Sequence, residues 1–469
     1  MKSVWLVSVA AAGLVAGCAS VPPNSGFDGI AEDVAAKGSA APVWPGVTLS
    51  EAEANTRIDA LLEAPLSEVA AIDLALLNNR GLRASYLGLK AAAGDYRDDA
   101  SLPNPFVSAM VFEVEDEPVT NLSYGIGIEL LDILFLPRRM KAAGRDFDAA
   151  QAATARTILD FIAEVRTAYY EVVAASQIAD LMGQAAEASE ASADVADALF
   201  EAGNIAEVER DRERFLAAQI RLDAMRAEAD LVAAREALNG LLGLHGTDAE
   251  NWIIAGRLRH APRESDLAAN PADLAASASL MLVESDARMA AAGARLGIEN
   301  VSSLIGEIEL EAERERDDGE YENGIGGGIE LPLFNWGGGA RQAAGARFEA
   351  MAQQRIADEI SLRAEARRLA AELEAARRAA DYQRGEVLPL AARVLNGAQL
   401  DYNAMQIGVF SLLDAKRGQL AAGRGYVTAL RDYWALRARY DQMMAGGSIG
   451  STLTGSGGMD AGSADRGGH

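Results

Sequence analysis

Hydrophobic and polar residues alternate with two different periods along the chain. Over residues 122–130 and again over 325–331 the apolar positions recur at every second residue, which predicts β-strands. Between Ile158 and Met182 they recur at alternating intervals of three and four, which predicts a long helix with a heptad seam. Short strands and very long helices are therefore expected in one chain.

The strand-to-helix passages look like two copies of one unit. Gly127-Ile128-Glu129-Leu130 and Gly328-Ile329-Glu330-Leu331 have the same residues, and the sequences that follow each of them align without a gap. An internal repeat of this kind predicts that both halves fold alike.

Turn residues and the change of period predict the boundaries of these units. A helical region from Leu49 to Tyr96 precedes a strand at Phe106–Glu113 and a second strand from Leu122 to about Leu134, with a helix after Pro137. The second copy has a strand from Leu304, a charged loop at 312–324, and a helix from Gly339 that is expected to kink at Pro389. The predicted domains are a signal peptide at 1–17, a tether at 18–48, a first repeat at 49–243 (β-hairpin 104–134, helical hairpin 138–243), a connector at 244–270, a second repeat at 271–446 (β-hairpin 303–334, helical hairpin 339–445), and a flexible tail at 447–469.

The N-terminus has the pattern of a secreted lipoprotein. A positive Lys2 and a short apolar stretch precede Leu14-Val15-Ala16-Gly17-Cys18, which resembles the bacterial lipobox. Cys18 is the only cysteine of the chain, so no disulfide can form within it. We expect Cys18 to be acylated, and Ala19 after it favours sorting to the outer membrane.

Charge and composition narrow the function classes. Lys plus Arg total 43 against 69 for Asp plus Glu, a formal net charge of -26, which argues against a nucleic-acid partner. The three histidines, His245, His260 and His469, do not have the spacing of metal ligands, and no nucleophile motif is present. We therefore predict that the protein is not an enzyme and needs no cofactor or metal.

The strands have the length that crosses a bilayer. Four strands of about ten residues cannot close a barrel, and open sheet edges are not tolerated in lipid, so membrane-spanning strands would require several chains to share one barrel. In the third strand glutamates share one face while apolar residues take the other, and Glu129 and Glu330 have the same parity against their apolar neighbours, which predicts a water-filled lumen lined by Glu129, Glu307, Glu309, Glu311 and Glu330. A soluble antiparallel sheet with one wet face explains the same alternation.

Several longer motifs carry a resemblance to a known family. The segments ALLNNRGL, SLPNPFVS, GIGIEL, GIELPLFNWGGG and YNAMQIGVFSLLDAKRGQL resemble the TolC-like outer-membrane efflux proteins, from about Leu49 to Gly446. The resemblance implies an α+β membrane protein: a homotrimer whose chains each give four strands to one β-barrel, continued by a long periplasmic α-helical barrel. The implied function is the outer-membrane channel of a tripartite efflux pump, a passive duct served by a periplasmic adaptor and an inner-membrane transporter.

The same resemblance assigns roles to the turns between the long helices. It implies adaptor contacts at Ala202, Gly203, Asn204 and Ile205 and at Ile407, Gly408, Val409 and Phe410, and a periplasmic gate ringed by Glu209 and Asp414. Arg417 stands where some members carry a second acid, so this ring is expected to be partly neutralised. A solvated helix face explains Glu209 equally well.

Two other functions remain open from the sequence. The chain can be the outlet of a type I secretion system, or a non-conducting coiled-coil structural lipoprotein that braces the periplasm. A spacer has no need of strands with one lipid-facing side and one side lined by glutamates. The strands therefore discriminate between a channel and a spacer.

Overall fold

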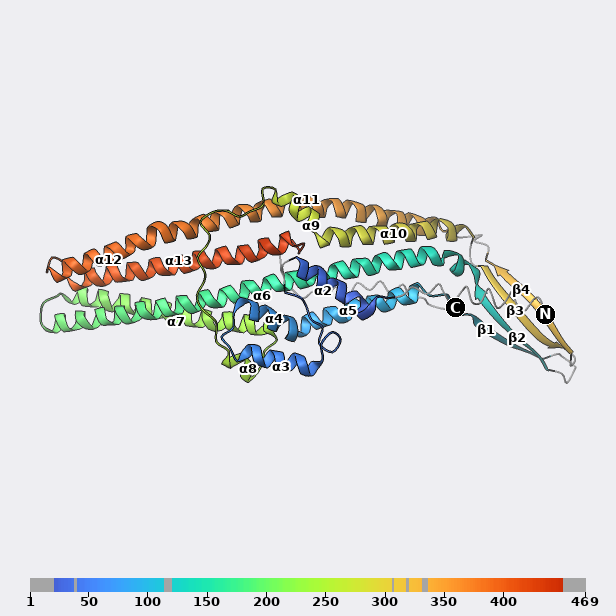
Figure 1. Cartoon of the computed structure of the whole chain (residues 1–469), viewed down its shortest axis with the longest axis horizontal. Coiled ribbons are helices and arrows are strands. Elements are labelled where there is room, and N and C mark those ends of the chain that lie inside the picture. The colour runs from blue at the N-terminus through green and yellow to red at the C-terminus, as the bar shows by residue number, and fades with distance from the viewer. Residues whose placement is uncertain are drawn as a thin grey trace.

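The computed structural model of the chain is a long rod with a small sheet at one end (Figure 1). It describes residues 21–37, 40–113, 120–305, 308–317, 320–330 and 336–449. The turns of two helical hairpins lie at the other end, and the shorter N-terminal helices lie beside the middle of the rod.

Most of the described chain is helical. The helices before the first hairpin are α2 (Phe27–Ala36), which follows a 3-10 turn at Pro23–Gly26, α3 (Glu51–Leu62), α4 (Glu68–Asn78) and α5 (Arg80–Asp99). The first helical hairpin and the connector contain α6 (Leu130–Glu201), α7 (Glu207–Leu242) and α8 (Thr247–Asn251). The second half contains α9 (Pro271–Ala278), α10 (Leu280–Ile305), α11 (Gly338–Tyr382), a π-helical turn (Gln383–Val387), α12 (Leu388–Asn403) and α13 (Val409–Met444).

Helix α6 is the central helix of the rod. Its 72 residues extend about 108 Å at a rise of 1.5 Å per residue, and it packs against α7, α10 and α13. It ends where Gly203 takes a left-handed conformation with φ of 74°, which a residue without a Cβ adopts readily. The chain then returns as α7.

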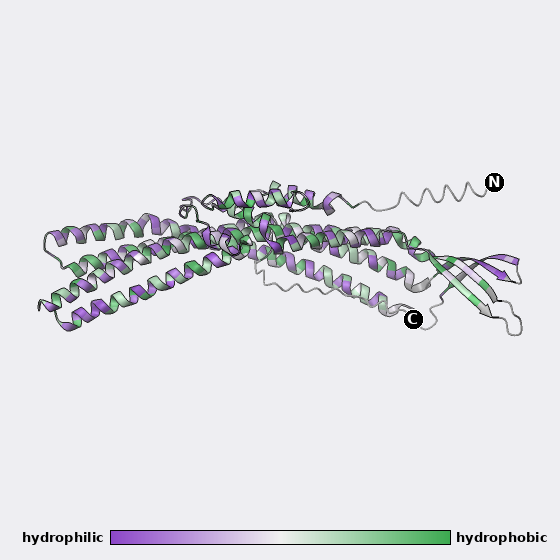
Figure 2. Cartoon of the chain, turned by 90° about the horizontal axis from the view of Figure 1, so that it is seen from below, coloured by the Kyte–Doolittle hydropathy of each residue, from purple (hydrophilic) through white to green (hydrophobic). Residues whose placement is uncertain are grey.

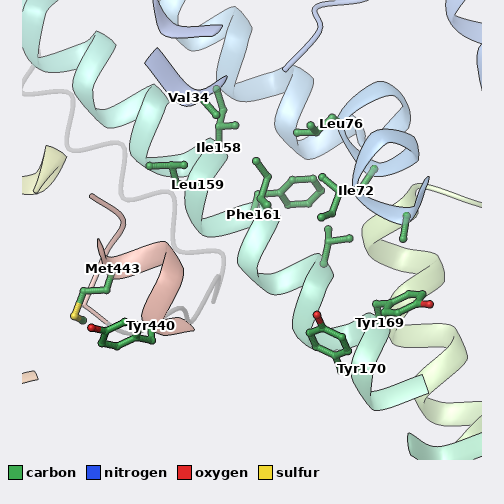
Figure 3. Close-up of a cluster of buried hydrophobic side chains, with 14 of the residues drawn as sticks. Val34, Ile72, Leu76, Ile158, Leu159, Phe161, Tyr169, Tyr170, Tyr440 and Met443 are labelled. Carbon is green, nitrogen blue, oxygen red and sulfur yellow. The ribbon is translucent and has the colours of Figure 1, made fainter. Parts of the chain in front are cut away.

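The hydrophobic core lies in the middle of the rod. There α6 contributes the fully buried Ile158, Val165 and Val172 to a cluster that also contains side chains of α4, α11 and α13, and Figure 3 shows part of it. Toward the hairpin turns only a small, alanine-rich cluster is buried, and α12 has no buried residue in the single chain. The middle is thus the rigid part, and the ends of the hairpins keep apolar surface uncovered.

The sheet joins the two halves of the chain. It consists of β1 (Phe106–Glu113), β2 (Thr120–Glu129), β3 (Ile308–Asp317) and β4 (Glu320–Ile329), antiparallel and in that order. The central β2–β3 pairing places Glu129 opposite Glu309 and connects the first hairpin to the second. Strands β1 and β4 are the edges, each with one neighbour in the chain.

Three predicted element ends are wrong. Strand β2 ends at Glu129 rather than near Leu134, and α6 begins at Leu130, before Pro137. Leu304 belongs to the last turn of α10 and not to a strand. Most of the expected charged loop is strand, because β3 continues to Asp317 and β4 starts at Glu320.

Hydrophilic and hydrophobic residues are interspersed along the helices (Figure 2). Among the helices of the described ranges, none combines the length and the apolar character needed to cross a membrane. A π-helical turn at Gln383–Val387 precedes Pro389, which has no amide hydrogen to continue the regular ladder.

Candidate functional site

The sheet has one strongly acidic face. Directly opposite residues of antiparallel strands share a face, so the pairs Glu129–Glu309, Gly127–Glu311 and Gly125–Glu313 place these carboxylates together. The same register adds Glu315, Glu320 and Glu322, which the sequence analysis had assigned to a loop. The described residues of this face include no lysine or arginine.

Short polar and glycine residues surround the carboxylates. Ser108 donates a hydrogen bond from its hydroxyl to Glu311, and Ser123 donates one to Glu313. Gly127 lies under the ring of Phe106, which a Cβ at that position would meet at 2.2 Å, so only glycine fits there. Of the predicted lumen residues, Glu330 is exposed just after β4, and Glu307 lies outside the described residues, as does Cys18.

The opposite face of the sheet is apolar and uncovered. Its large side chains are exposed to an extent unusual for a folded protein, 77% for Val107 and 84% for Ile325. Other exposed members of this face are Val111, Leu122, Tyr124, Ile126, Leu310 and Ile329. At its far end the guanidinium of Arg314 lies 4.4 Å from the ring centroid of Tyr321. A sheet with these two faces separates an apolar environment from water.

The two predicted tips lie at the end of the rod opposite the sheet (Figure 1). Ala202, Gly203, Asn204 and Ile205 form the turn between α6 and α7, and Ile407 and Gly408 belong to the turn between α12 and α13. Val409 and Phe410 begin α13. At the second turn Met405 takes the left-handed conformation, with φ of 59°, and its side chain is 93% exposed.

The two predicted gate carboxylates have different surroundings. Glu209 accepts a hydrogen bond from the backbone amide of Ala206 at 3.2 Å and so caps the first turn of α7. Asp414 is 82% exposed on its side chain and lies 3.8 Å from Arg417. Of these two carboxylates, Asp414 therefore has the freer charge.

A third carboxylate near the tips was missed in the sequence. Glu213 accepts hydrogen bonds from Arg417 of α13 at 2.9 Å and from Ser192 of α6 at 2.8 Å. The side chains of Glu213 and Arg417 are only 13% and 12% exposed. The position of Glu213 one helical turn after Glu209 was the available signal, but nothing local indicates its partner on α13.

The fold resembles that of solved outer-membrane channels, and part of the sequence matches a known family model. Residues 71–244 match the model of the outer membrane efflux protein family.

Particular relatives cover nearly the whole chain. The cobalt-zinc-cadmium resistance protein CzcC of Cupriavidus metallidurans is 26% identical over 386 residues, which are 81% of this chain and 90% of CzcC. The outer-membrane channel OprN superposes with a TM-score of 0.68 at 18% identity, covering 84% of this chain and 92% of OprN. The outer membrane protein VceC of Vibrio cholerae does so with a TM-score of 0.64 at 16% identity, covering 84% of this chain and 97% of VceC.

Proposed function

We propose that this protein is the outer-membrane channel of a tripartite efflux pump. The sheet spans the outer membrane, and the helices continue the duct through the periplasm toward an adaptor and an inner-membrane transporter. The observation that carries this proposal is the four-stranded sheet, apolar on one face and glutamate-lined on the other. The duct itself is passive, and the transporter supplies the energy.

Assembly as a homotrimer completes the barrel. Edge strands with unpaired backbone groups cannot remain open in lipid, so β4 of one chain pairs with β1 of the next. The helices support the same assembly, because α7 exposes an apolar stripe at seven-residue intervals, Val208, Phe215 and Leu222, at 73%, 65% and 48%. A neighbouring chain would cover this stripe.

Each end of the channel then has a role. We assign adaptor contact to the turns at Ala202–Ile205 and Ile407–Phe410, the periplasmic gate to Asp414 together with Glu209, and membrane anchoring to an acylated Cys18. Three chains would bring six carboxylates to the tip, which attracts cations.

Metal cations are the cargo that we favour. CzcC is named for resistance to cobalt, zinc and cadmium. A lumen lined by glutamates, on a face whose described residues include no lysine or arginine, lowers the energy of a passing cation. A type I secretion outlet would share the fold, but this acidic lining gives it no specific support. A structural spacer is disfavoured by the apolar face of the sheet.

Planar-bilayer recording of the full-length protein tests the proposal. We expect discrete conductance with a cation preference, and a weaker preference in Asp414→Ala. Glu209→Gln keeps an acceptor for the helix cap and removes only the charge, so it isolates the electrostatic role of this residue. Asp230→Ala, on α7 away from the tips, is the matched control. A pure protein that forms no trimer and no conductance would refute the channel.

A further inference from the structure

The four strands contain two basic residues, and both lie on the apolar face of the sheet. Arg314 and Arg316 of β3 stand at alternate positions, so they share the face of Ala312. Glu313 and Glu315 alternate with them and point to the acidic face. The sequences of β1, β2 and β4 contain no lysine or arginine. Strand β3 therefore sorts its charge, with glutamates on one face and guanidinium groups on the other.

Both arginines lie where the apolar face of β3 and β4 ends. Over residues 308–312 the side chains of β3 on this face are apolar, and from Arg314 onward they are basic. Strand β4 changes at the same level, since Asn323 pairs with Arg314 and Tyr321 pairs with Arg316. This end of the sheet is the one remote from the helices (Figure 1). The change from apolar to polar side chains therefore marks the far boundary of the apolar band.

Tyrosines flank the two guanidinium groups. The register places Tyr124 of β2 opposite Arg314, and Tyr321 of β4 opposite Arg316. The guanidinium carbons of Arg314 and Arg316 lie 4.4 and 5.8 Å from the ring centroid of Tyr321, and such contacts orient a guanidinium group. Tyr124, Arg314, Arg316 and Tyr321 are here called the rim patch.

The positive charge of the rim patch is available to a ligand. Arg314 and Arg316 are exposed, in a chain whose formal net charge is -26. Among the residues that the structure describes, no carboxylate lies within ion-pairing distance of either guanidinium. The ring of Tyr321 is a much weaker hydrogen-bond acceptor than a carboxylate or a phosphate, so the N–H donors of both groups can still bind an anion.

The position of the rim patch in the proposed channel indicates which anion it meets. If the proposed function holds, on which this inference rests, the sheet crosses the outer membrane and its hairpin turns face outward. The rim patch then lies at the level of the headgroups in the outer leaflet. Pairing of β4 with β1 of the next chain leaves the patch uncovered, so a trimer presents three copies.

The chemistry of the rim patch suits a phosphorylated headgroup. Guanidinium groups bind phosphate oxygens through paired hydrogen bonds, which gives geometric preference as well as charge. Tyrosine is favoured at the boundary between lipid and water, because its ring is apolar and its hydroxyl is polar. The main lipid of the outer leaflet is a glycolipid that carries phosphate groups on its sugars.

We propose that the rim patch binds the phosphate groups of the outer-leaflet glycolipid, one lipid for each chain. Arg314 and Arg316 hold the phosphate oxygens, and Tyr321 orients the two guanidinium groups. This contact fixes the height of the barrel in the membrane from its outer side, independently of the proposed acyl anchor on the periplasmic side.

Native mass spectrometry of the full-length trimer in an uncharged detergent, titrated with bisphosphorylated lipid A, tests this binding. We expect up to three bound molecules per wild-type trimer. Arg314→Gln/Arg316→Gln should need about a tenfold higher concentration for the same occupancy, as expected for the loss of two exposed ion pairs. Arg80→Gln/Arg212→Gln, at exposed positions of α5 and α7, removes the same charge away from the sheet and should bind as the wild type does.

Dephosphorylated lipid A supplies a second test that needs no variant. The wild type should bind it about tenfold more weakly than the bisphosphorylated form, and this comparison decides the question if Arg314→Gln/Arg316→Gln does not assemble. Equal binding of the two lipids, equal binding of the rim variant and the wild type, or an equal loss in the control variant would each overturn the inference. Equally tight, rim-dependent binding of phosphatidylglycerol would overturn it too, as would displacement of lipid A by inorganic phosphate at the same concentration.

Bilayer conductance of the same preparations separates this inference from the proposed function. The rim patch faces away from the lumen, so the rim variant should conduct as the wild type does. A conducting wild-type trimer that binds no lipid A refutes only the rim patch, whereas a wild type that forms no trimer and no conductance refutes the channel.

Discussion

Glu164 is a partly buried acid in the middle of α6. It lies one turn after Asp160, whose carboxylate accepts a hydrogen bond from the backbone amide of Ser448 at 2.8 Å. Within the described chain Glu164 Oε2 has no hydrogen-bond partner. Burial, and secondarily the charge of Asp160, raise the pKa of Glu164 above its ordinary value.

The raised pKa has a defined consequence for stability. The folded state binds the proton of Glu164 more tightly than the unfolded state does, so the protonated group stabilises the fold at pH values below its unfolded pKa. This contribution is lost as the pH rises through the folded pKa. Ionised Glu164 is therefore a cost to the fold at neutral pH.

Replacing Glu164 by glutamine removes this cost. We expect Glu164→Gln to melt at a higher temperature than the wild type at pH 7, with the difference narrowing toward pH 4, because glutamine cannot ionise. Thermal melts followed by circular dichroism of the detergent-solubilised protein give the melting temperatures at both pH values. Glu187→Gln, at an exposed position of the same helix, should change neither curve. A lower melting temperature for Glu164→Gln at pH 7 would mean that ionised Glu164 does not destabilise the fold.

Between elements, the pair of Glu213 and Arg417 joins the two helical hairpins near their tips. Glu213 of α7 receives hydrogen bonds from α13 and from α6, so one carboxylate touches three helices. Little apolar surface is buried in this part of the chain. Polar contacts therefore contribute a large share of the cohesion there.

Breaking this pair should loosen the tips. Arg417→Gln leaves the charged, poorly solvated Glu213 without its cation. We expect this to lower the stability of the fold by about 1–3 kcal/mol, which lies between the losses for breaking an exposed and a buried ion pair. We expect a larger or more frequently open conductance in bilayers, and partial recovery in Glu213→Gln/Arg417→Gln. Arg214→Gln breaks the exposed pair with Asp197 inside one hairpin and should leave the conductance unchanged. If the Arg417→Gln channel has the same conductance as the wild type, the ion pair does not hold the tips closed.

Element ends were predictable where a residue has a conformational reason to stop the chain. Gly243 ends α7 with φ of 67°, and β1 has its predicted bounds after a proline-rich break. The run Leu130–Leu136 misled because its apolar residues fit a strand and a helix equally well. Residues 313–317 misled because charge suggests a loop, although a wet sheet face accepts glutamates at alternate positions.

The site was predictable to the extent that it depends on local pattern. Alternation along β3 placed two of the predicted lumen glutamates, Glu309 and Glu311, on a common face. The ion pair of Glu213 and Arg417 joins residues 204 positions apart, and its existence depends on how two hairpins cross. Neither residue type nor spacing contains that information.

At the scale of the whole molecule, the sheet of the proposed channel decides which side of the assembly meets lipid. Ile325 and Gly324 are neighbours in β4 and point to opposite faces. Ile325 is 84% exposed on the apolar face, opposite Ala312. Gly324 lies on the acidic face opposite Glu313, with open space where a Cβ would be.

The same substitution at these two positions separates the faces. Ile325→Lys puts a cation into lipid at a cost of about 2–4 kcal/mol near the bilayer midplane, so we expect fewer heat-modifiable trimers in outer-membrane fractions. Gly324→Lys enters the water-filled lumen beside Glu313, so trimers should form normally and the cation preference in bilayers should fall. The reverse outcome, a tolerated Ile325→Lys and a Gly324→Lys that fails to assemble, would mean that the acidic face is not the lumen. The cation-conducting duct would then have to be abandoned, since no other surface of the strands could surround water.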